Sequence, residues 1–320
     1  MVLENAISLL GSAWTDYQRL VREALHSDIK LLDNLNESLL RSSGKQLRPL
    51  LSLLMAGALG GISEDSAKYA AAAEILHNAT LLHDDVVDGA DTRRGKPTLA
   101  STLGPSPAVL VGDFWLSAMV KLVIGTAHRD EAIELYSSTL SHLAEGEMLQ
   151  MEKAAAGDTT EEDYYTIIYD KTASLFEVSC LTGALSAGAD GRLYEAAGSF
   201  GRALGIAFQI RDDILDYGDP SGLGKPVGQD LAERKITLPL LGALKGCDDE
   251  ARIRGMVADI DSHPEYCGEI AGFVLSHGGV KYAARALEEQ IDCALDALTS
   301  LPESPFRDAL GGIARYLVVR

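Results

Sequence analysis

The sequence predicts an all-helical protein. Apolar residues recur at three- and four-residue steps, Ala, Leu and Gly dominate while aromatic residues make up 6% of the chain, and no convincing alternating strand appears. Hydrophobic residues fill 47% of the 320 positions, so a sizeable core is possible. No loop is long or biased enough to link two domains. We therefore expect residues 1–320 to form a single helical domain.

The expected helices follow one another along the chain. Residues 3–40 carry apolar side chains at helical spacing, as at Leu9, Trp14 and Val21, which predicts two amphipathic helices. Residues 50–87 are apolar almost all round, which predicts interior helices with one break at Gly60 and Gly61. The same texture returns in VLVGDFWLSAMVKLVIG, SHLAEGEMLQME, YYTIIYDKTASLFEVSCLTGALSAG, FGRALGIAFQIRDDILDY and YAARALEEQIDCALDAL. Loops are predicted at STLGPSP, AAAGDTT, GDPSGLGKPVG and LPESPF.

Charge and cysteine usage exclude several classes of protein. The formal charge of -19 argues against nucleic-acid partners, because binding to a phosphate backbone needs clustered Lys and Arg. Such a protein can still bind an anionic substrate through divalent cations. The four cysteines show no spacing typical of a zinc site or a disulfide framework. With no signal peptide pattern and no uncharged apolar run of about 18 residues, we expect a cytoplasmic protein with at most peripheral membrane contact.

Two short acidic motifs, HDDVVD and RDDILD, repeat one spacing in different apolar segments. They contain Asp84, Asp85 and Asp88, and Asp212, Asp213 and Asp216. On a helix the first and last carboxylates of each motif lie one turn apart on one face, where they can share a cation. One triplet alone is typical of a solvated helix end, but two copies favour a metal site. Oxygen ligands without His or Cys select Mg²⁺ or Mn²⁺, and a diphosphate is the natural bridging ligand.

The apolar neighbours of HDDVVD predict that this helix end lies in the interior, where carboxylates need a positive partner. Cationic side chains do accompany the motifs, namely Lys45, Arg48, Arg93, Arg94, Lys171, Lys225 and Lys235. Each of them alone is by default a solvated surface residue. His77 lies two helical turns before Asp84, either as a core histidine or as a donor to phosphate.

At this point the chain resembles the trans-isoprenyl diphosphate synthases, and especially their long-chain octaprenyl and solanesyl branch. The resemblance covers nearly the whole chain and rests on GKQLRP, EILHNATLLHDDVVDGADTRRGKPT, VLVGDF, EGEMLQ, YDKTASLF, FQIRDDILDY and GKPVGQDLAERKITLPLL. It implies a bundle of long helices around a deep central cavity, usually a homodimer, with the two aspartate-rich helices opposite each other at the cavity mouth.

The resemblance also implies roles for individual residues. Both aspartate motifs would hold about three Mg²⁺ ions on an allylic diphosphate such as farnesyl diphosphate, assisted by Arg93, Lys171, Lys225 and Lys235. Isopentenyl diphosphate would bind at Lys45, Arg48, His77 and Arg94. Thr172 and Gln209 would lie near the reacting carbons, and Asp230 would support the second motif. One departure is visible, because Ser43 and Gln46 stand where the family usually has a glycine and a base.

Product length is predicted from two positions before the first aspartate. Short-chain members of the family block the cavity there with bulky residues, whereas this chain has Ala79 and Thr80. Each isoprene unit adds about 4 to 5 Å, about three residues of helix rise. We therefore expect a product of roughly 35 to 50 carbons, such as octaprenyl diphosphate, supplying quinone side chains. The tunnel floor would be formed by Tyr69, or by Met119 and Val123.

Three other interpretations fit parts of the sequence. A terpene cyclase also ionises allylic diphosphates, but its second metal motif mixes Asn, Ser or Thr, and Glu, unlike RDDILD. A catalytically silent subunit that regulates a partner commonly loses acids that are intact here. A helical cation-binding protein without turnover would explain the carboxylates but not the accompanying basic residues.

Overall fold

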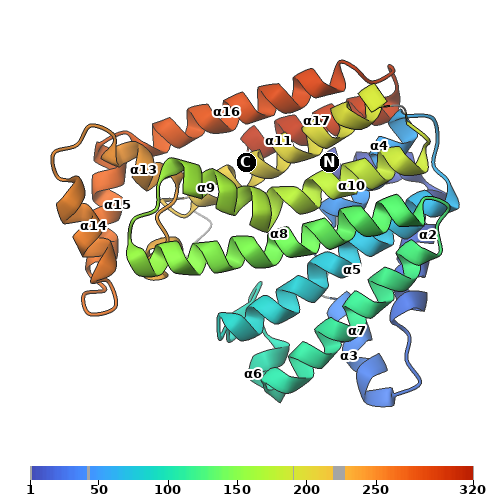
Figure 1. Cartoon of the computed structure of the whole chain (residues 1–320), viewed down its shortest axis with the longest axis horizontal. Helices are drawn as coiled ribbons and strands as arrows, with labels where there is room; N and C mark the ends of the chain where they lie inside the picture. Colours follow the sequence, from blue (N-terminus) through green and yellow to red (C-terminus); the bar gives the residue numbers. More distant parts are fainter. Residues whose placement is uncertain (1, 42–43, 190, 219–227, 320) are drawn as a thin grey trace. The chain divides into compact units, whose positions relative to one another are not determined.

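The computed structural model describes residues 2–41, 44–189, 191–218 and 228–319, with side chains up to residue 316. It confirms the all-α prediction, since helices make up nearly all of the regular structure (Figure 1). The chain divides into two compact units. The first unit comprises Met1–Ser137, Val178–Gly198 and Ser300–Leu310, and the second unit comprises Ser138–Glu177, Ser199–Thr299 and Gly311–Arg320. The single domain expected from the sequence stays a prediction.

The helices follow the predicted segments closely. The first unit contains α1 Val2–Leu10, α2 Ser12–Leu25, α3 Lys30–Leu40, α4 Leu47–Ala58, α5 Glu64–Val87, α6 Leu99–Leu103 and α7 Pro105–Ile124. The second unit contains α9 Glu161–Ile168, the π-helix η1 Tyr169–Ala173, α12 Gln229–Ala232, α13 Leu238–Leu244, α14 Glu250–Ala258, α15 Tyr266–Ser276 and α16 Gly279–Leu298. Residues of both units belong to α8 Arg129–Ala156, α10 Ser174–Ser186, α11 Gly191–Leu215 and α17 Pro305–Val319.

The N-terminal segment forms three helices, so the prediction of two was wrong. Gly11 separates α1 from α2 with a φ of 54°, a conformation that glycine adopts without strain. The buried Asn36 of α3 donates to the Leu25 carbonyl at 2.6 Å and accepts from Trp115 Nε1 at 2.8 Å. Because one amide satisfies partners on α2 and α7, α3 is held against both helices.

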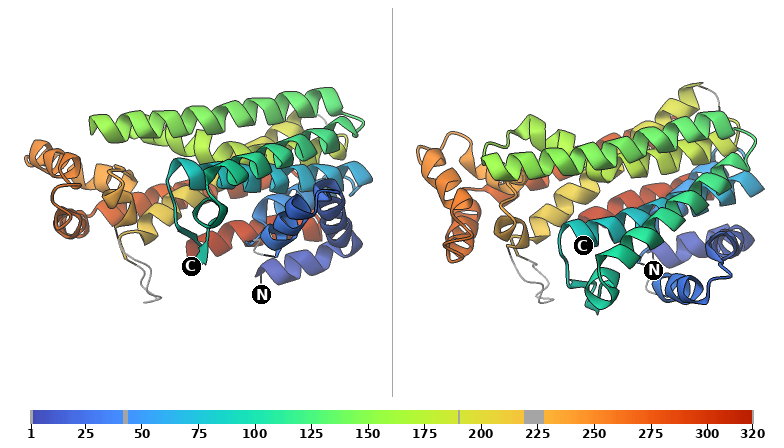
Figure 2. Two further views of the ribbon diagram at one scale, coloured as in Figure 1. Left: turned by 90° about the horizontal axis from the view of Figure 1, so that it is seen from below. Right: turned by 60° about the horizontal axis from the view of Figure 1, so that its bottom comes forward.

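Helix α5 is the interior element of the first unit. The predicted break at Gly60 and Gly61 is present, and both glycines have positive φ. Ser63 then caps α5 by accepting from the backbone N–H of Ser66 at 3.3 Å. From there α5 packs along α7 and α4, as the views in Figure 2 show for the first unit. Its alanines from 70 to 73 are fully buried, as their apolar surroundings predict.

A hairpin of two short strands, each of two residues, follows α5. It was not predicted, because the sequence indicated no strand. Thr92–Arg93 pairs antiparallel with Lys96–Pro97 (Figure 2). Arg94 and Gly95 form the turn, with φ values of 53° and 73°. Two positive φ values match the twist of a two-residue hairpin, but an Arg-Gly pair is not the usual sequence signal for one. The hairpin fixes where Arg93 and Arg94 lie.

Helix α7 is long and apolar enough to cross a membrane by length and composition. One such helix is weak support for membrane insertion, since a core helix of the same length has the same character. In the first unit α7 packs against α5 and buries Ala108, Trp115 and Val123.

Close helix packing in the first unit depends on Gly183 of α10. A Cβ at this position would lie 2.3 Å from the carbonyl oxygen of Ser52, which is backbone and cannot move away cheaply. We predict that Gly183→Ala destabilises the protein by about 1 to 3 kcal/mol and lowers the thermal midpoint. The matched control is Gly255→Ala in the exposed part of α14, where a Cβ meets nothing within 4 Å. Equal midpoints for Gly183→Ala and the unmodified protein would contradict this account of the packing.

Candidate active site

The first aspartate motif ends α5 and is buried only in part. Asp85 is 5% exposed, whereas Asp84 is half-buried and Asp88, the C-cap, is exposed. The prediction that this whole helix end is interior was therefore wrong, because Val87 in the last turn is 59% exposed. The buried carboxylate does have its positive partner: Arg93 Nε donates to Asp85 Oδ1 at 2.6 Å.

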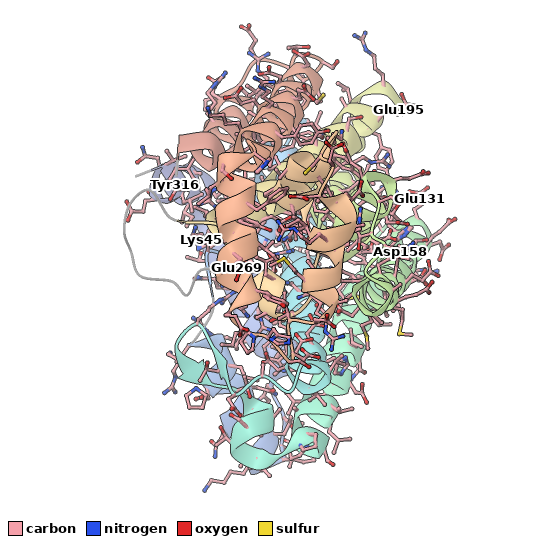
Figure 3. The ribbon with its side chains drawn as sticks, turned by 90° about the vertical axis from the view of Figure 1, so that its left-hand side faces the viewer. Lys45, Glu131, Asp158, Glu195, Glu269 and Tyr316 are labelled. Carbon is pink, nitrogen blue, oxygen red and sulfur yellow. The ribbon has the colours of Figure 1, made fainter. Side chains whose placement is uncertain are left out.

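The hairpin directs Arg94 towards the start of α4. A Cβ at Gly44 would lie 2.6 Å from Arg94 Nη1, so the guanidinium occupies the space that a side chain at position 44 would fill. Gln46, the N-cap of α4, has φ 50° and ψ 43°, which is unusual for a residue with a side chain. Ser43 lies outside the described residues. Lys45, labelled in Figure 3, is exposed.

A buried acid that sequence reasoning missed lies among the basic residues of the first unit. Glu74 is 5% exposed, and Asn78 Nδ2 donates to its Oε1 at 3.1 Å. Burial raises the pKa of Glu74, while Asn78 and the charges of Arg48 and Arg94 oppose the rise. An acid three residues before His77 in the apolar segment AEILH was the available signal.

His77 and Arg48 belong to the same group. Burial lowers the pKa of His77 well below its ordinary value, and Arg48 and Arg94 lower it further, so the imidazole is neutral at pH 7. Burial also lowers the pKa of Arg48, to about 10, although Glu74 raises it, and the guanidinium stays charged. The structure therefore brings Arg48, His77 and Arg94 within electrostatic reach of one another.

The three aspartates of the second motif have different surroundings. The Asp212 side chain is 46% exposed and lies 3.4 Å from Arg211 Nη1. Asp216 accepts from the backbone N–H groups of Gln229 and Asp230, both at 3.0 Å, and so caps α12. Identical spacing in the two motifs did not reveal this difference.

Asp213 is 2% exposed and accepts hydrogen bonds on both of its carboxylate oxygens. Tyr164 Oη donates to its Oδ2 at 2.6 Å, and Gln209 Nε2 donates to its Oδ1 at 2.8 Å. Thr172 Oγ1 in turn donates to Gln209 Oε1 at 2.8 Å. Burial and then the charge of Asp230 raise the pKa of Asp213, so this carboxylate calls for a positive partner.

Lys171 and Thr172 lie on the π-helix η1, which the sequence pattern did not predict. Lys171 Nζ lies 2.5 Å from Glu147 Oε2 and donates to Gln150 Oε1 at 3.2 Å. A Cβ at Gly146 would lie 2.6 Å from Asp170 Cβ, so the glycine of EGEMLQ lets η1 approach α8. Single π-turns are frequent at functional sites.

The second unit encloses a cavity of about 190 Å³ around these residues. It brings together the predicted Lys171, Thr172, Gln209, Asp213, Asp230 and Lys235. Gln150, Lys153 and Tyr164 also line it, and the sequence reasoning had named none of them. Lys235 pairs with Glu233. Lys225 lies outside the described residues.

The donor set of both motifs fits a hard divalent cation. The motif side chains offer carboxylate oxygens, which Mg²⁺ prefers, and Asp85 and Asp213 are buried enough to need positive charge. Within the described part of either unit, no three His, Cys, Asp or Glu side chains come close enough to hold a metal by themselves. This arrangement suits Mg²⁺, which is usually bound through one or two carboxylates and completes its shell with substrate phosphates.

A family profile described as Polyprenyl synthetase matches residues 29–270. The chain belongs to this family. An octaprenyl diphosphate synthase of Escherichia coli (strain K12) is 36% identical over 322 residues, with 100% of this chain and 99% of that protein covered. A decaprenyl diphosphate synthase from Rhodobacter capsulatus has a crystal structure similar to this one with a TM-score of 0.94 at 33% identity, covering 99% of each chain.

A polyprenyl synthase from Caulobacter crescentus CB15, solved with calcium and isoprenyl diphosphate, matches with a TM-score of 0.90 at 34% identity and covers 99% of this chain and 98% of its own. Membership of the polyprenyl synthetases makes this protein a prenyltransferase with the all-α isoprenoid synthase fold. The family acts on isoprenyl diphosphates and uses a divalent metal. The family assignment and the fold class predicted from the sequence are thus confirmed.

We predict that Gly44→Ala weakens anion binding in the first unit without unfolding it. The new Cβ would displace the Arg94 guanidinium, which is the flexible end of its side chain, so the fold can adapt. Loss of one charge-assisted hydrogen bond corresponds to about tenfold weaker binding of pyrophosphate. Calorimetric titration with pyrophosphate and a thermal melt test this, with Gly268→Ala, where a Cβ meets nothing within 4 Å, as the control. Equal pyrophosphate affinity in both variants would rule out this role of Gly44.

Proposed function

We propose that this protein is a long-chain all-trans polyprenyl diphosphate synthase that joins isopentenyl diphosphate head-to-tail onto an allylic diphosphate such as farnesyl diphosphate. One observation carries the proposal: in each unit an aspartate motif occurs together with cationic side chains that can bind a phosphate group. The similarity to octaprenyl and decaprenyl diphosphate synthases supports a long product.

The residues of the second unit would act on the allylic diphosphate. Lys171 and Lys235 line the cavity beside Asp213 and supply positive charge to the departing pyrophosphate. Arg93 and Lys225 would act on the same group. A bound divalent metal would add the positive charge that lets the C–O bond of the allylic diphosphate break. We propose about three Mg²⁺ ions held by the two motifs, with Mn²⁺ as a substitute.

The allylic cation would form next to Thr172 and Gln209. The Thr172 hydroxyl donates its proton to a hydrogen bond with Gln209. The lone pairs of the hydroxyl oxygen can therefore face a developing positive charge. The double bond of isopentenyl diphosphate then attacks C1 of the cation. Loss of a proton to the released pyrophosphate restores a double bond and completes one cycle.

The isopentenyl diphosphate would bind in the first unit at Lys45, Arg48, His77 and Arg94. Arg48 stays charged, and the neutral His77 can donate one N–H to a phosphate oxygen while adding no charge. Gln46 offers an amide where the family usually has a base, so it adds no positive charge to this subsite.

A long product requires space beside α5, and the small residues there support it. Ala79 is fully buried, and Thr80 is half-buried with its hydroxyl donating to the His77 carbonyl at 2.9 Å. At the other end of the helix, Tyr69 Oη donates to Thr126 Oγ1 at 2.8 Å. Val123 and Met119 of α7, which precede Thr126 in the sequence, are buried. We propose that Tyr69, or Met119 with Val123, limits the product to roughly 35 to 50 carbons. Its use would be in quinone side chains.

We further propose that the enzyme is a cytoplasmic homodimer. Helix α7 supports the dimer, because Leu110, Val120 and Ile124 expose large apolar side chains on it. A second copy of the same chain would cover such a surface.

The decisive experiment incubates the purified protein with Mg²⁺, labelled isopentenyl diphosphate and farnesyl diphosphate, and sizes the products by mass spectrometry. We expect a metal-dependent ladder that ends at roughly 35 to 50 carbons. Asp84→Ala should reduce turnover by at least about a hundredfold, because it removes a metal-binding carboxylate. A ladder that stops at about 20 carbons would keep the synthase and discard the long tunnel. No product at all would favour a silent or partner-dependent subunit.

The position of the tunnel has its own test in Ala79→Phe. If the growing tail passes Ala79, the phenyl ring blocks it and the main product shortens to about 15 or 20 carbons. Ala79→Ser is the size-matched control, and its product should keep the original length. A long product from a folded Ala79→Phe enzyme, with an unchanged thermal midpoint, would show that the tail runs elsewhere.

A further inference from the structure

Tyr164 is a buried tyrosine whose hydroxyl points at the second aspartate motif. It lies in the first turns of α9, is 3% exposed, and donates to Asp213 Oδ2 at 2.6 Å. A phenol hydroxyl donates one hydrogen bond, and here the carboxylate oxygen accepts it. No sequence motif singled this residue out.

Helix α9 holds Tyr164 in a defined position. Thr160 and Asp163 form a reciprocal cap at the start of α9, with the Asp163 N–H donating to Thr160 Oγ1 at 3.1 Å. Lys153 of α8 reaches Asp163 Oδ2 at 3.1 Å. The ring of Tyr165 then meets that of Tyr164 edge-on at 5.5 Å. The tyrosine is thus fixed before any substrate binds.

The hydrogen bonds beyond Asp213 all run towards its carboxylate. The Gln209 NH₂ group donates to Asp213 Oδ1 at 2.8 Å. The Gln209 carbonyl therefore faces Thr172, whose hydroxyl must donate to it at 2.8 Å. Asp213 determines the Gln209 amide orientation, and the amide determines where the Thr172 proton points.

We propose that Tyr164 is a positioning residue that holds the Asp213 carboxylate in place and, through Gln209, orients the Thr172 hydroxyl on the cavity wall. This inference rests on the proposed function, in which Thr172 lies beside the developing allylic cation. Without the phenol, Asp213 keeps only the Gln209 bond of these two. The carboxylate can then rotate, the Gln209 amide can flip, and an NH₂ group facing Thr172 turns the hydroxyl proton towards the cavity.

The kinetic test uses Tyr164→Phe, with Tyr165→Phe as the matched control on the same helix. Because the hydrogen bonds end at Thr172, beside the reacting carbons, and include none of the residues proposed for isopentenyl diphosphate, we expect kcat to fall about tenfold while KM for isopentenyl diphosphate changes by less than about twofold. Tyr165→Phe should leave both constants near their original values. A loss confined to KM, or equal losses in both variants, would overturn the proposal.

A double-mutant cycle with Thr172→Val tests whether Tyr164 acts through these hydrogen bonds. If Tyr164 acts through the Thr172 hydroxyl, Tyr164→Phe should cost less than about twofold in kcat once that hydroxyl is gone. The same tenfold loss in both backgrounds would mean that Tyr164 acts by another route.

A crystal structure of Tyr164→Phe tests the inference without any turnover, and so separates it from the proposed function. We expect the Thr172–Gln209 or Gln209–Asp213 distance to exceed 3.5 Å, the limit of a hydrogen bond. If both bonds persist unchanged, the positioning role is wrong even when the enzyme is an active synthase. If the bonds are lost but the unmodified protein makes no product, the positioning role stands and the proposed reaction fails.

Discussion

The cost of placing carboxylates inside an apolar helical protein governs this structure. Asp85, Glu74 and Asp213 are each at most 5% exposed, in a chain whose formal charge is -19. Each is stabilised by specific partners: Arg93 for Asp85, Asn78 with nearby guanidinium groups for Glu74, and Tyr164 with Gln209 for Asp213. Burial of these carboxylates without such partners would strongly destabilise the folded protein. The positions of Arg48, Arg93 and Arg94 meet this requirement in the first unit.

Features that depend on local spacing could be predicted from the sequence. The all-α class, the break at Gly60 and Gly61, and the two aspartate motifs could be predicted because each depends on residues close together in one segment. The family motifs added Lys171, Thr172 and Gln209, which do line one cavity. Arg48 of GKQLRP and Arg94 of TRR likewise both lie near Glu74.

Features that depend on distant partners could not be predicted. Tyr164 and Asp213 are 49 residues apart, and no pattern in either segment predicts their contact. The hairpin after α5 lacks the usual Asn-Gly signal, and Gly11 divides a segment whose apolar spacing continues on both sides. The two motifs look equivalent in sequence, yet Asp216 caps a short helix while Asp212 is half exposed. Position along a helix is local, but the surroundings of a side chain are set by whatever packs against it.

The π-helix η1 has a geometric consequence for the reaction. A π-turn contains one residue more than an α-turn, so it rotates every following side chain relative to those before it. Asp170 can thus face Gly146 on α8 while Thr172, two positions later, reaches Gln209. If this turn were a regular α-helix, the side chains after it would be rotated by about 100°, the rotation of one residue. Either Lys171 or Thr172 would then point away from the cavity. The π-turn thus lets Lys171 and Thr172, adjacent in the sequence, both line one cavity.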